Sequence, residues 1–185
     1  HSIDKMAWAM RDTPPVKCVA HGGRQVRTAP EFGNIYDHFS IVYDYPEGVK
    51  GFHFSRQQLG CANDNSDYIM GSDGVAHIVR AFSGPFVLKG KKNWRYRESR
   101  PSDMYQNEHD ELFAGIRSGK LINDGVVMAH STLLAIMGRM AAYTGQEITW
   151  EQALNSQEKL VPDIHGWETP VAVPPVALPG QTKFI

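Results

Sequence analysis

Residues 35–58, IYDHFSIVYDYPEGVKGFHFSRQQ, predict a β-hairpin, and this hairpin decides the fold class. The first half alternates between two faces with the period of two that is typical of a strand. One face carries Tyr36, His38, Ser40, Val42 and Asp44, and the other carries Asp37, Phe39, Ile41, Tyr43 and Tyr45. The segment PEG supplies a turn, and residues 49–57 return as the second strand. A hairpin of this kind predicts an antiparallel sheet.

Similar strand patterns flank the hairpin on both sides. Residues 16–23, VKCVAHGG, alternate before it, and residues 67–82, DYIMGSDGVAHIVRAF, repeat the hairpin pattern after it. Residues 83–97, SGPFVLKGKKNWRYR, add shorter strands. Strands are therefore expected from about residue 16 to residue 96. Strands that follow one another without intervening helices favour an antiparallel sheet over a doubly wound one.

Helical patterns lie before and after the strands. The first ten residues, HSIDKMAWAM, fit a short amphipathic helix, which the prolines of DTPP end. Residues 101–119 predict a helix with Ser102 or Asp103 as its N-cap and Gly119 as its stop.

Two further helices and a tail complete the chain. Residues 125–145 predict a second long helix, and Thr149 caps a short third one, so helices are expected over about residues 103–156. Residues 157–185 hold five of the 11 prolines and are expected to run extended. Together the elements predict one α+β domain over residues 1–185. It has a large, mainly antiparallel open sheet with helices packed on one face, followed by an extended Pro-rich C-terminal tail.

The composition excludes several function classes. The formal net charge is −1, which gives no electrostatic reason to expect nucleic acid or an anionic membrane as a partner. No apolar run approaches the ~18 residues that a membrane span needs. Cys18 and Cys61 lie in different segments without a CxxC spacing, which favours two free thiols over a disulfide or a metal site. The cellular compartment stays open.

The sequence carries none of the common catalytic or cofactor motifs. It has no GxGxxG after a strand, no GxxxxGK[ST], no GxSxG and no HExxH. Eight histidines are spread over strands and helices, and each alone is most simply a partly buried residue hydrogen-bonded to backbone. The residues by themselves therefore indicate a soluble α+β domain and no reaction.

Seven stretches, in this order, resemble a known family. They are HSIDKMAWAM, GGRQVR, GNIYDHFSIVYDYPEGV, GSDG, NEHDELFAGIRSGK, STLLAIMGRMAAYTGQEITWEQAL and PVAVPPVALPGQTKF. Their sequence is similar to the C-terminal substrate-binding domain of the Gfo/Idh/MocA oxidoreductases, which are nicotinamide-dependent dehydrogenases of sugars and cyclitols. The resemblance implies an N-terminal Rossmann domain with a glycine fingerprint and a Glu-Lys-Pro motif, neither of which occurs in this sequence.

The resemblance also implies roles for particular residues. His1 matches the histidine of a family motif near the start of the second domain and is the expected general base, or hydrogen-bond partner, for a substrate hydroxyl. Asp4 matches the motif's downstream aspartate and would orient the imidazole or cap the helix. The expected substrate contacts are Arg24, Tyr36, His38, His109 and Trp167, and no metal site is expected.

Cofactor and partners follow from the same resemblance. NAD or NADP is expected in the full-length protein and none on this fragment, which is expected to be inactive alone. The expected partners are a sugar-like substrate, the chain's own Rossmann domain and a further copy bound through the sheet face.

Two rival interpretations stay open beside the dehydrogenase. One is a non-catalytic carbohydrate-binding or assembly domain. The other is a relative that cleaves glycosides without net redox change, using bound NAD. The substrate, the choice between NAD and NADP, and the oligomer number are also open.

Overall fold

The computed structural model describes residues 1–79, 86–96 and 103–185, which form two compact units. The first unit comprises His1 and residues 3–61 and 128–185, and the second comprises residues 62–127 together with Ser2. The predicted strand residues 80–85 and 97 and the alternative N-cap Ser102 lie outside the described residues. Each unit is described by itself below.

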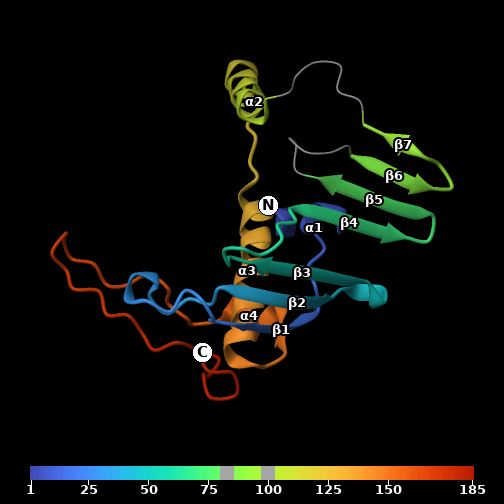
Figure 1. Cartoon of the computed structure of the whole chain (residues 1–185). Coiled ribbons are helices and arrows are strands. Elements are labelled where there is room, and N and C mark those ends of the chain that lie inside the picture. Colours follow the sequence, from blue (N-terminus) through green and yellow to red (C-terminus); the bar gives the residue numbers. More distant parts are fainter. Residues whose placement is uncertain (80–85, 97–102) are drawn as a thin grey trace. The chain divides into compact units, whose positions relative to one another are not determined.

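The first unit is built on a four-stranded antiparallel sheet (Figure 1). Its strands are β1 (Lys17–Gly23), β2 (His38–Asp44), β3 (Lys50–Arg56) and the short β8 (Ile148–Thr149), in the order β3-β2-β1-β8. Strands β2 and β3 form the predicted hairpin, with Asp44 paired to Lys50 next to the turn. The turn is the 3₁₀ segment η2 (Pro46–Gly48), where Glu47 and Gly48 both have positive φ.

Helices cover one face of this sheet. They are α1 (Ser2–Ala9), α3 (Gly125–Thr144) and α4 (Trp150–Asn155), and Figure 1 shows α3 passing across strands β1 to β3. The side chains buried between helices and sheet are Ala7, Cys18, Ile41, Tyr43, Tyr45, Leu134, Met137, Met140, Ala141, Ile148 and Ala153. Ile41, Tyr43 and Tyr45 all lie on one of the two faces that the alternation defines, so this face is the core face.

Two side chains of the sheet bond directly to the backbone of α3. The Tyr43 hydroxyl donates to the carbonyl of Leu134 at 2.7 Å, and the Cys18 thiol donates to the carbonyl of Met137 at 3.6 Å. Burial raises the pKa of Cys18 to about 12, so the thiol stays protonated and is a weak nucleophile. Cys18 and Cys61 are both free, as the sequence predicted.

The second unit contains another four-stranded antiparallel sheet and one helix. Its strands are β4 (Ser66–Gly71), β5 (Gly74–Val79), β6 (Val87–Gly90) and β7 (Trp94–Arg95), paired in that order. Helix α2 (Met104–Ser118) begins after Asp103, whose carboxylate accepts the backbone N–H groups of Tyr105 and Gln106 at 2.9 and 3.3 Å. It ends at Gly119, which has φ 70°. Asp103 is thus the N-cap, one of the two residues predicted for it.

The α+β class with antiparallel strands is confirmed. Hydrogen bonds divide the eight described strands between two four-stranded sheets. The single domain predicted for residues 1–185 stays a prediction.

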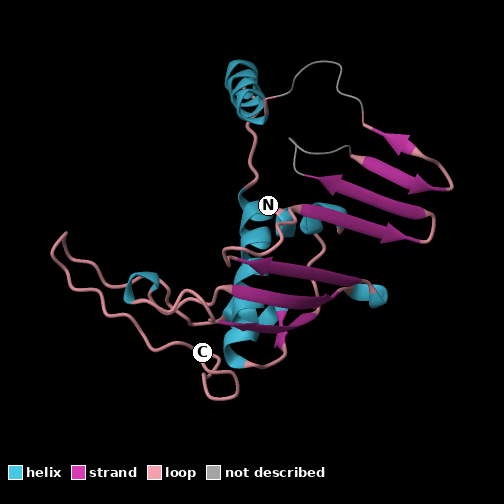
Figure 2. Cartoon of the chain, in the orientation of Figure 1, coloured by secondary structure: helices cyan, strands magenta, loops and turns pink. Residues whose placement is uncertain are grey.

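Residues 157–185, all of them described, form neither helix nor strand, and Figure 2 shows them as loop. The end of this tail is fastened to the first unit. The Gly180 N–H donates to the Thr144 carbonyl at 2.8 Å, and the Ser156 hydroxyl donates to the Ile185 carbonyl at 2.5 Å. The tail therefore belongs to the structure of the first unit even without secondary structure of its own.

The sequence analysis found no apolar run as long as a membrane span, but helix α3 reaches that length. It has 20 residues, and 18 of them have a mean hydropathy of 1.3. By length and composition alone, α3 is therefore long and apolar enough to cross a membrane. Core helices pass the same test, and the second half of α3 carries buried residues that pack in the core of the first unit. The second half of α3 therefore packs as part of the core of the first unit.

The approach of α3 to the sheet depends on a glycine, which gives a first prediction. A Cβ at Gly138 would lie 2.3 Å from Ile41 Cδ1 and 2.8 Å from the Tyr43 hydroxyl oxygen. Gly138→Ala gains about 1 kcal/mol of helix propensity, but overpacking of a core costs about 1–3 kcal/mol. We expect a net loss in the free energy of unfolding, measured by urea denaturation. Ala135→Gly, at an exposed position of α3, measures the propensity effect alone; a more stable Gly138→Ala protein would contradict this packing.

The other face of the first sheet is partly apolar and lies away from the helices. The register places Val19, Val42 and Phe52 in one row of this face, next to the buried row of Cys18 and Tyr43. Phe52 is 58% exposed and Phe54, two residues on, is 71% exposed. An apolar surface with aromatic side chains is typical of subunit interfaces.

We therefore predict that the chain forms at least a dimer through this outer face, where a two-fold axis would place the same surface on both copies. Sedimentation velocity at micromolar concentration should give a mass above the 20.7 kDa of one chain. The double substitution Phe52→Glu and Phe54→Glu should yield the monomer, because two buried charges oppose association. Leu59→Glu, at a fully exposed position after β3, is the control. A wild-type monomer would refute the prediction.

Candidate functional site

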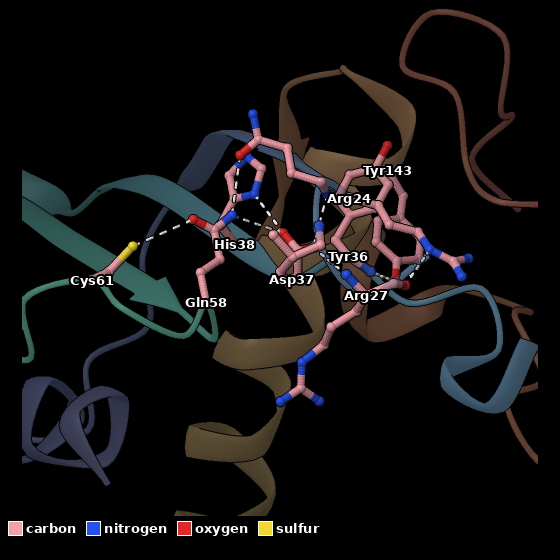
Figure 3. A network of polar contacts seen from close by, with 10 residues as sticks. Arg24, Arg27, Tyr36, Asp37, His38, Gln58, Cys61 and Tyr143 are labelled. Carbon is pink, nitrogen blue, oxygen red and sulfur yellow. Dashed lines mark hydrogen bonds and ion pairs between the residues drawn. The ribbon is translucent and has the colours of Figure 1, made fainter. Parts of the chain in front are cut away.

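The ends of three neighbouring strands bring polar side chains together in the first unit. Gln25 follows β1, Asp37 directly precedes β2 and Gln58 follows β3. Because β2 is antiparallel to both of its neighbours, the end of β1, the start of β2 and the end of β3 lie at the same rim of the sheet. Figure 3 shows the resulting polar network.

The carboxylate of Asp37 is the centre of the network. Its Oδ2 accepts the backbone N–H groups of Gln25, Val26 and Arg27 at 2.8, 2.7 and 3.1 Å. Its Oδ1 accepts the amide of Gln58 at 3.2 Å and lies 2.8 Å from His38 Nδ1. Asp37 is only 4% exposed, so these contacts replace the water that a carboxylate would otherwise bind.

The charge of Asp37 is stabilised by this arrangement. Burial alone would raise the pKa of the carboxyl group, but the hydrogen bonds from His38 and from the backbone of Val26, Arg27 and Gln25 outweigh burial and hold the pKa well below its usual range. Asp37 is therefore an anion at neutral pH.

His38 is the member of the network that solvent can reach. Its side chain is 33% exposed, and its ring lies across Gly23 on β1, where an added Cβ would come within 3.0 Å of Cε1 and 3.2 Å of Nε2. Asp37 on one side and the space above Gly23 on the other fix the orientation of the imidazole. The amide of Gln58 also donates to Gln25 Oε1 at 3.1 Å, so the side-chain amides of Gln58 and Gln25 lie next to the Asp37–His38 pair.

Two other predicted substrate contacts, Arg24 and Tyr36, form hydrogen bonds within the protein. The Arg24 guanidinium donates to the carbonyls of Arg27, Gly33 and Ala29 at 2.5, 2.6 and 3.2 Å, so it closes the loop between β1 and β2. Tyr36 is 6% exposed, and its hydroxyl donates to the Ala177 carbonyl at 2.8 Å. Its ring packs on Tyr143 of α3 with ring centroids 4.5 Å apart.

Tyr36 corrects one detail of the sequence analysis. The alternation assigned it to the same face as His38, but Tyr36 and Asp37 precede β2, where the period of two no longer applies. The side chain of Tyr36 therefore turns toward α3 and joins a buried cluster with Ala142 and Ala177.

The remaining predicted site residues lie elsewhere. His1 is exposed at the N-cap of α1, where its side chain makes no capping hydrogen bond, and Asp4 lies in the first turn of that helix. Trp167 is fully exposed in the tail. His109 belongs to α2 in the second unit, where its Nδ1 lies 2.7 Å from the Tyr105 carbonyl oxygen. The network around Asp37 thus includes only His38 of the predicted contacts, with Arg24 and Tyr36 beside it.

Asp37, Gln25 and Gln58 were not predicted as site residues. The sequence signal for Gln58 is the hairpin register, since the pairing of His38 with Arg56 places Gln58 beside the start of β2. For Asp37 the available signal was an acidic residue immediately before the predicted alternating strand. The three N–H groups that it accepts come from a loop, and their direction is not encoded in any periodic pattern.

The described residues lack the usual dinucleotide-binding arrangement. Every strand pair in them is antiparallel, and they contain no strand that leads through a glycine-rich loop into a helix, which is the usual arrangement for binding a pyrophosphate. Within the same ranges no group of three or more His, Cys, Asp or Glu side chains could hold a metal ion.

The comparisons with known proteins support the fold. No protein-family model matches the sequence, and no curated protein sequence does. Among solved structures, the aldose-aldose oxidoreductase of Caulobacter crescentus, complexed with glycerol, has a TM-score of 0.63 and 17% identity over 80% of this chain and 44% of that one. The UDP-N-acetylglucosamine 3-dehydrogenase GnnA of Acidithiobacillus ferrooxidans has a TM-score of 0.62 and 14% identity over 76% and 44%.

A third match contains a cofactor. The WlbA dehydrogenase of Bordetella pertussis, in complex with NADH and UDP-GlcNAcA, has a TM-score of 0.56 and 14% identity over 80% of this chain and 42% of that one. The chain spans less than half the length of these structures. The fold expected from the resemblance is therefore confirmed: the chain folds like one part of these oxidoreductases and dehydrogenases.

The low pKa of Asp37 predicts a pH-dependent contribution to stability. A carboxyl group whose pKa is lower in the folded than in the unfolded chain stabilises the fold above the unfolded pKa of about 3.9, and this stabilisation is lost as the pH falls below it. Asp37→Asn should lower the free energy of unfolding at pH 7 by about 2 kcal/mol, because hydrogen bonds to a charged group contribute about 1.5–3 kcal/mol. The difference between variant and wild type should shrink between pH 5 and pH 3.

Urea denaturation at pH 7, 5 and 3.5 measures this dependence. Asp163→Asn, at an exposed position of the tail, is the matched control and should leave the pH dependence unchanged. Parallel curves for Asp37→Asn and wild type across this range would show that Asp37 is not the stabilising anion.

Proposed function

We propose that this chain is the substrate-binding and subunit-contact part of a nicotinamide-dependent oxidoreductase that acts on a sugar, a sugar derivative or a cyclitol, related to the Gfo/Idh/MocA enzymes. The observation that carries the proposal is the shared fold. Three oxidoreductases or dehydrogenases match 76–80% of this chain, and the matched part is 42–44% of their own length. Two are named for aldoses or a nucleotide sugar, and the third is in complex with NADH and UDP-GlcNAcA.

The chemistry of the sheet rim supports a polyhydroxylated ligand. A sugar presents many hydroxyl groups, each of which can donate and accept, so its site needs several donors and acceptors at fixed positions. The imidazole of His38 and the amides of Gln25 and Gln58 supply both kinds of group beside a buried anion that holds them in place.

In this proposal the other predicted residues keep separate roles. His1, exposed at the start of α1, is the general base or hydrogen-bond partner for the reacting hydroxyl, and Asp4 orients it or stabilises the helix start. Arg24 and Tyr36 shape the rim from within the protein, through the loop carbonyls and the tail. Trp167, exposed in the tail, contacts the ligand by stacking on a sugar ring, and His109 of α2 stays a predicted substrate contact.

The nicotinamide cofactor, NAD or NADP, is then held by a dinucleotide-binding part outside these residues and accepts the hydride. The three-stranded rim contributes binding and orientation only. NAD or NADH titrated into the 185-residue chain should therefore give no saturable calorimetric signal.

A second function has its own supporting observation. The exposed apolar outer face of the first sheet also suits a carbohydrate-binding or assembly domain without catalysis. Reaction assays separate it from the dehydrogenase, because an assembly domain binds a partner but reduces no cofactor. A non-redox glycoside-cleaving enzyme would release the aglycone without a net change in NADH.

The test uses protein expressed from the complete open reading frame. Reduction of NAD or NADP is followed at 340 nm with D-glucose, myo-inositol and UDP-N-acetylglucosamine as substrates. His1→Ala should lower kcat by about 10²–10⁴-fold, as expected for a general acid–base group, with little change in thermal unfolding. His165→Ala, in the exposed tail, is the control. Absence of cofactor reduction with all three substrates, or a His1→Ala enzyme within a few-fold of wild type, would contradict the proposal.

A further inference from the structure

We propose that Asp37 is a positioning residue that holds His38 in the tautomer with its proton on Nδ1, so that Nε2 accepts a hydrogen bond from a ligand hydroxyl. This inference rests on the proposed function only for the identity of the ligand. The tautomer itself follows from the hydrogen bonds of the sheet rim.

The first step concerns where a proton could sit on Asp37. Oδ2 faces three backbone N–H groups, those of Gln25, Val26 and Arg27, and a backbone N–H can only donate. Oδ2 must therefore be an acceptor without a proton. Oδ1 faces the Gln58 amide, which donates to it and to Gln25 Oε1 together. A proton on Oδ1 would have to point at His38 Nδ1, and because an imidazole is a stronger base than a carboxylate, that proton resides on the histidine.

The second step concerns His38. Its Nδ1 lies 2.8 Å from Oδ1, a distance that requires a proton between the two atoms. Because Asp37 has no proton to donate, the proton belongs to Nδ1. In the neutral imidazole the other nitrogen, Nε2, then carries the lone pair.

The third step concerns access to Nε2. The ring lies over Gly23, which leaves room for it because a Cβ there would come within 3.2 Å of Nε2. The side chain is one-third exposed, and no hydrogen bond to Nε2 comes from residues 1–79, 86–96 or 103–185. A hydroxyl group of a polyol can therefore reach this atom and donate to it, while the other polar atoms of the rim contact its neighbours.

The substitution Asp37→Asn is expected to reverse the tautomer of His38. The three backbone N–H groups would select the oxygen of the new side-chain amide as their acceptor, so its NH₂ group would face His38. That NH₂ group can only donate, and His38 Nδ1 would then have to accept. Asp37→Asn should therefore move the imidazole proton to Nε2 and convert the exposed nitrogen from an acceptor to a donor.

The experiment is long-range ¹⁵N–¹H NMR of the histidine rings at pH 8.5, with His38 assigned from the spectrum of His38→Gln. In wild type, we expect the protonated, pyrrole-like nitrogen of His38 to be Nδ1, in about tenfold excess, the ratio that corresponds to about 1.4 kcal/mol. In Asp37→Asn the excess should reverse to Nε2. A wild-type His38 with its proton on Nε2 would overturn the proposal, and this outcome needs no variant.

Glycerol, a small polyol, probes the acceptor role of Nε2. Titrated to molar concentration, it should shift the Nε2 resonance of wild type and shift it several-fold less in Asp37→Asn. Gly23→Ala keeps the carboxylate but crowds the ring, so it should retain the Nδ1 proton and lose most of the glycerol response. An unshifted Nε2 in wild type would overturn the acceptor role.

The two proposals can fail separately. If the full-length protein reduces no cofactor but the tautomer is as expected, the oxidoreductase function fails and the role of Asp37 stands. If the enzyme is active and His38 has its proton on Nε2, the role of Asp37 fails alone.

Discussion

The buried carboxylate of Asp37 is the interaction on which the rim of the first sheet depends. A single anion collects five hydrogen bonds from the segments that follow β1, begin β2 and follow β3. Removing a carboxylate from water is unfavourable unless its lone pairs find donors, and here the donors come from three separate segments of the chain. The loop, the imidazole and the Gln58 amide therefore adopt their geometry together, because each satisfies the same charge.

The body of the sheet depends on a different constraint, the close approach of α3. Gly138 lets the helix backbone come near Ile41 and Tyr43, and the Tyr43 hydroxyl then reaches the Leu134 carbonyl. Tyr36 extends this contact to the rim, since its ring packs on Tyr143 of the same helix and its hydroxyl bonds to the tail. Core packing and the polar rim are thus joined through two adjacent residues, Tyr36 and Asp37.

The sequence predicted those parts of the fold that have a period or a cap. Alternation in residues 35–58 predicted the hairpin, and Asp103 and Gly119 predicted the ends of α2. Alternation failed at Tyr36, which lies before β2 begins at His38. The three backbone partners of Asp37 lie in a loop without a repeating pattern, so the network is visible only in the structure. His38 was predicted as a ligand contact, but its orientation depends on Asp37, whose role was not foreseen.

The first unit is discontinuous along the chain, and this has a consequence for biosynthesis. Strand β8 pairs with β1 although about 130 residues separate Lys17 from Thr149, and α3, which covers the sheet, also comes late. A ribosome therefore releases the β2–β3 hairpin long before the helix that shields Tyr43 and Ile41 exists. Closing so long a loop is slow, and unshielded strands invite aggregation. During translation the nascent hairpin thus exposes its apolar face until the last 58 residues have emerged.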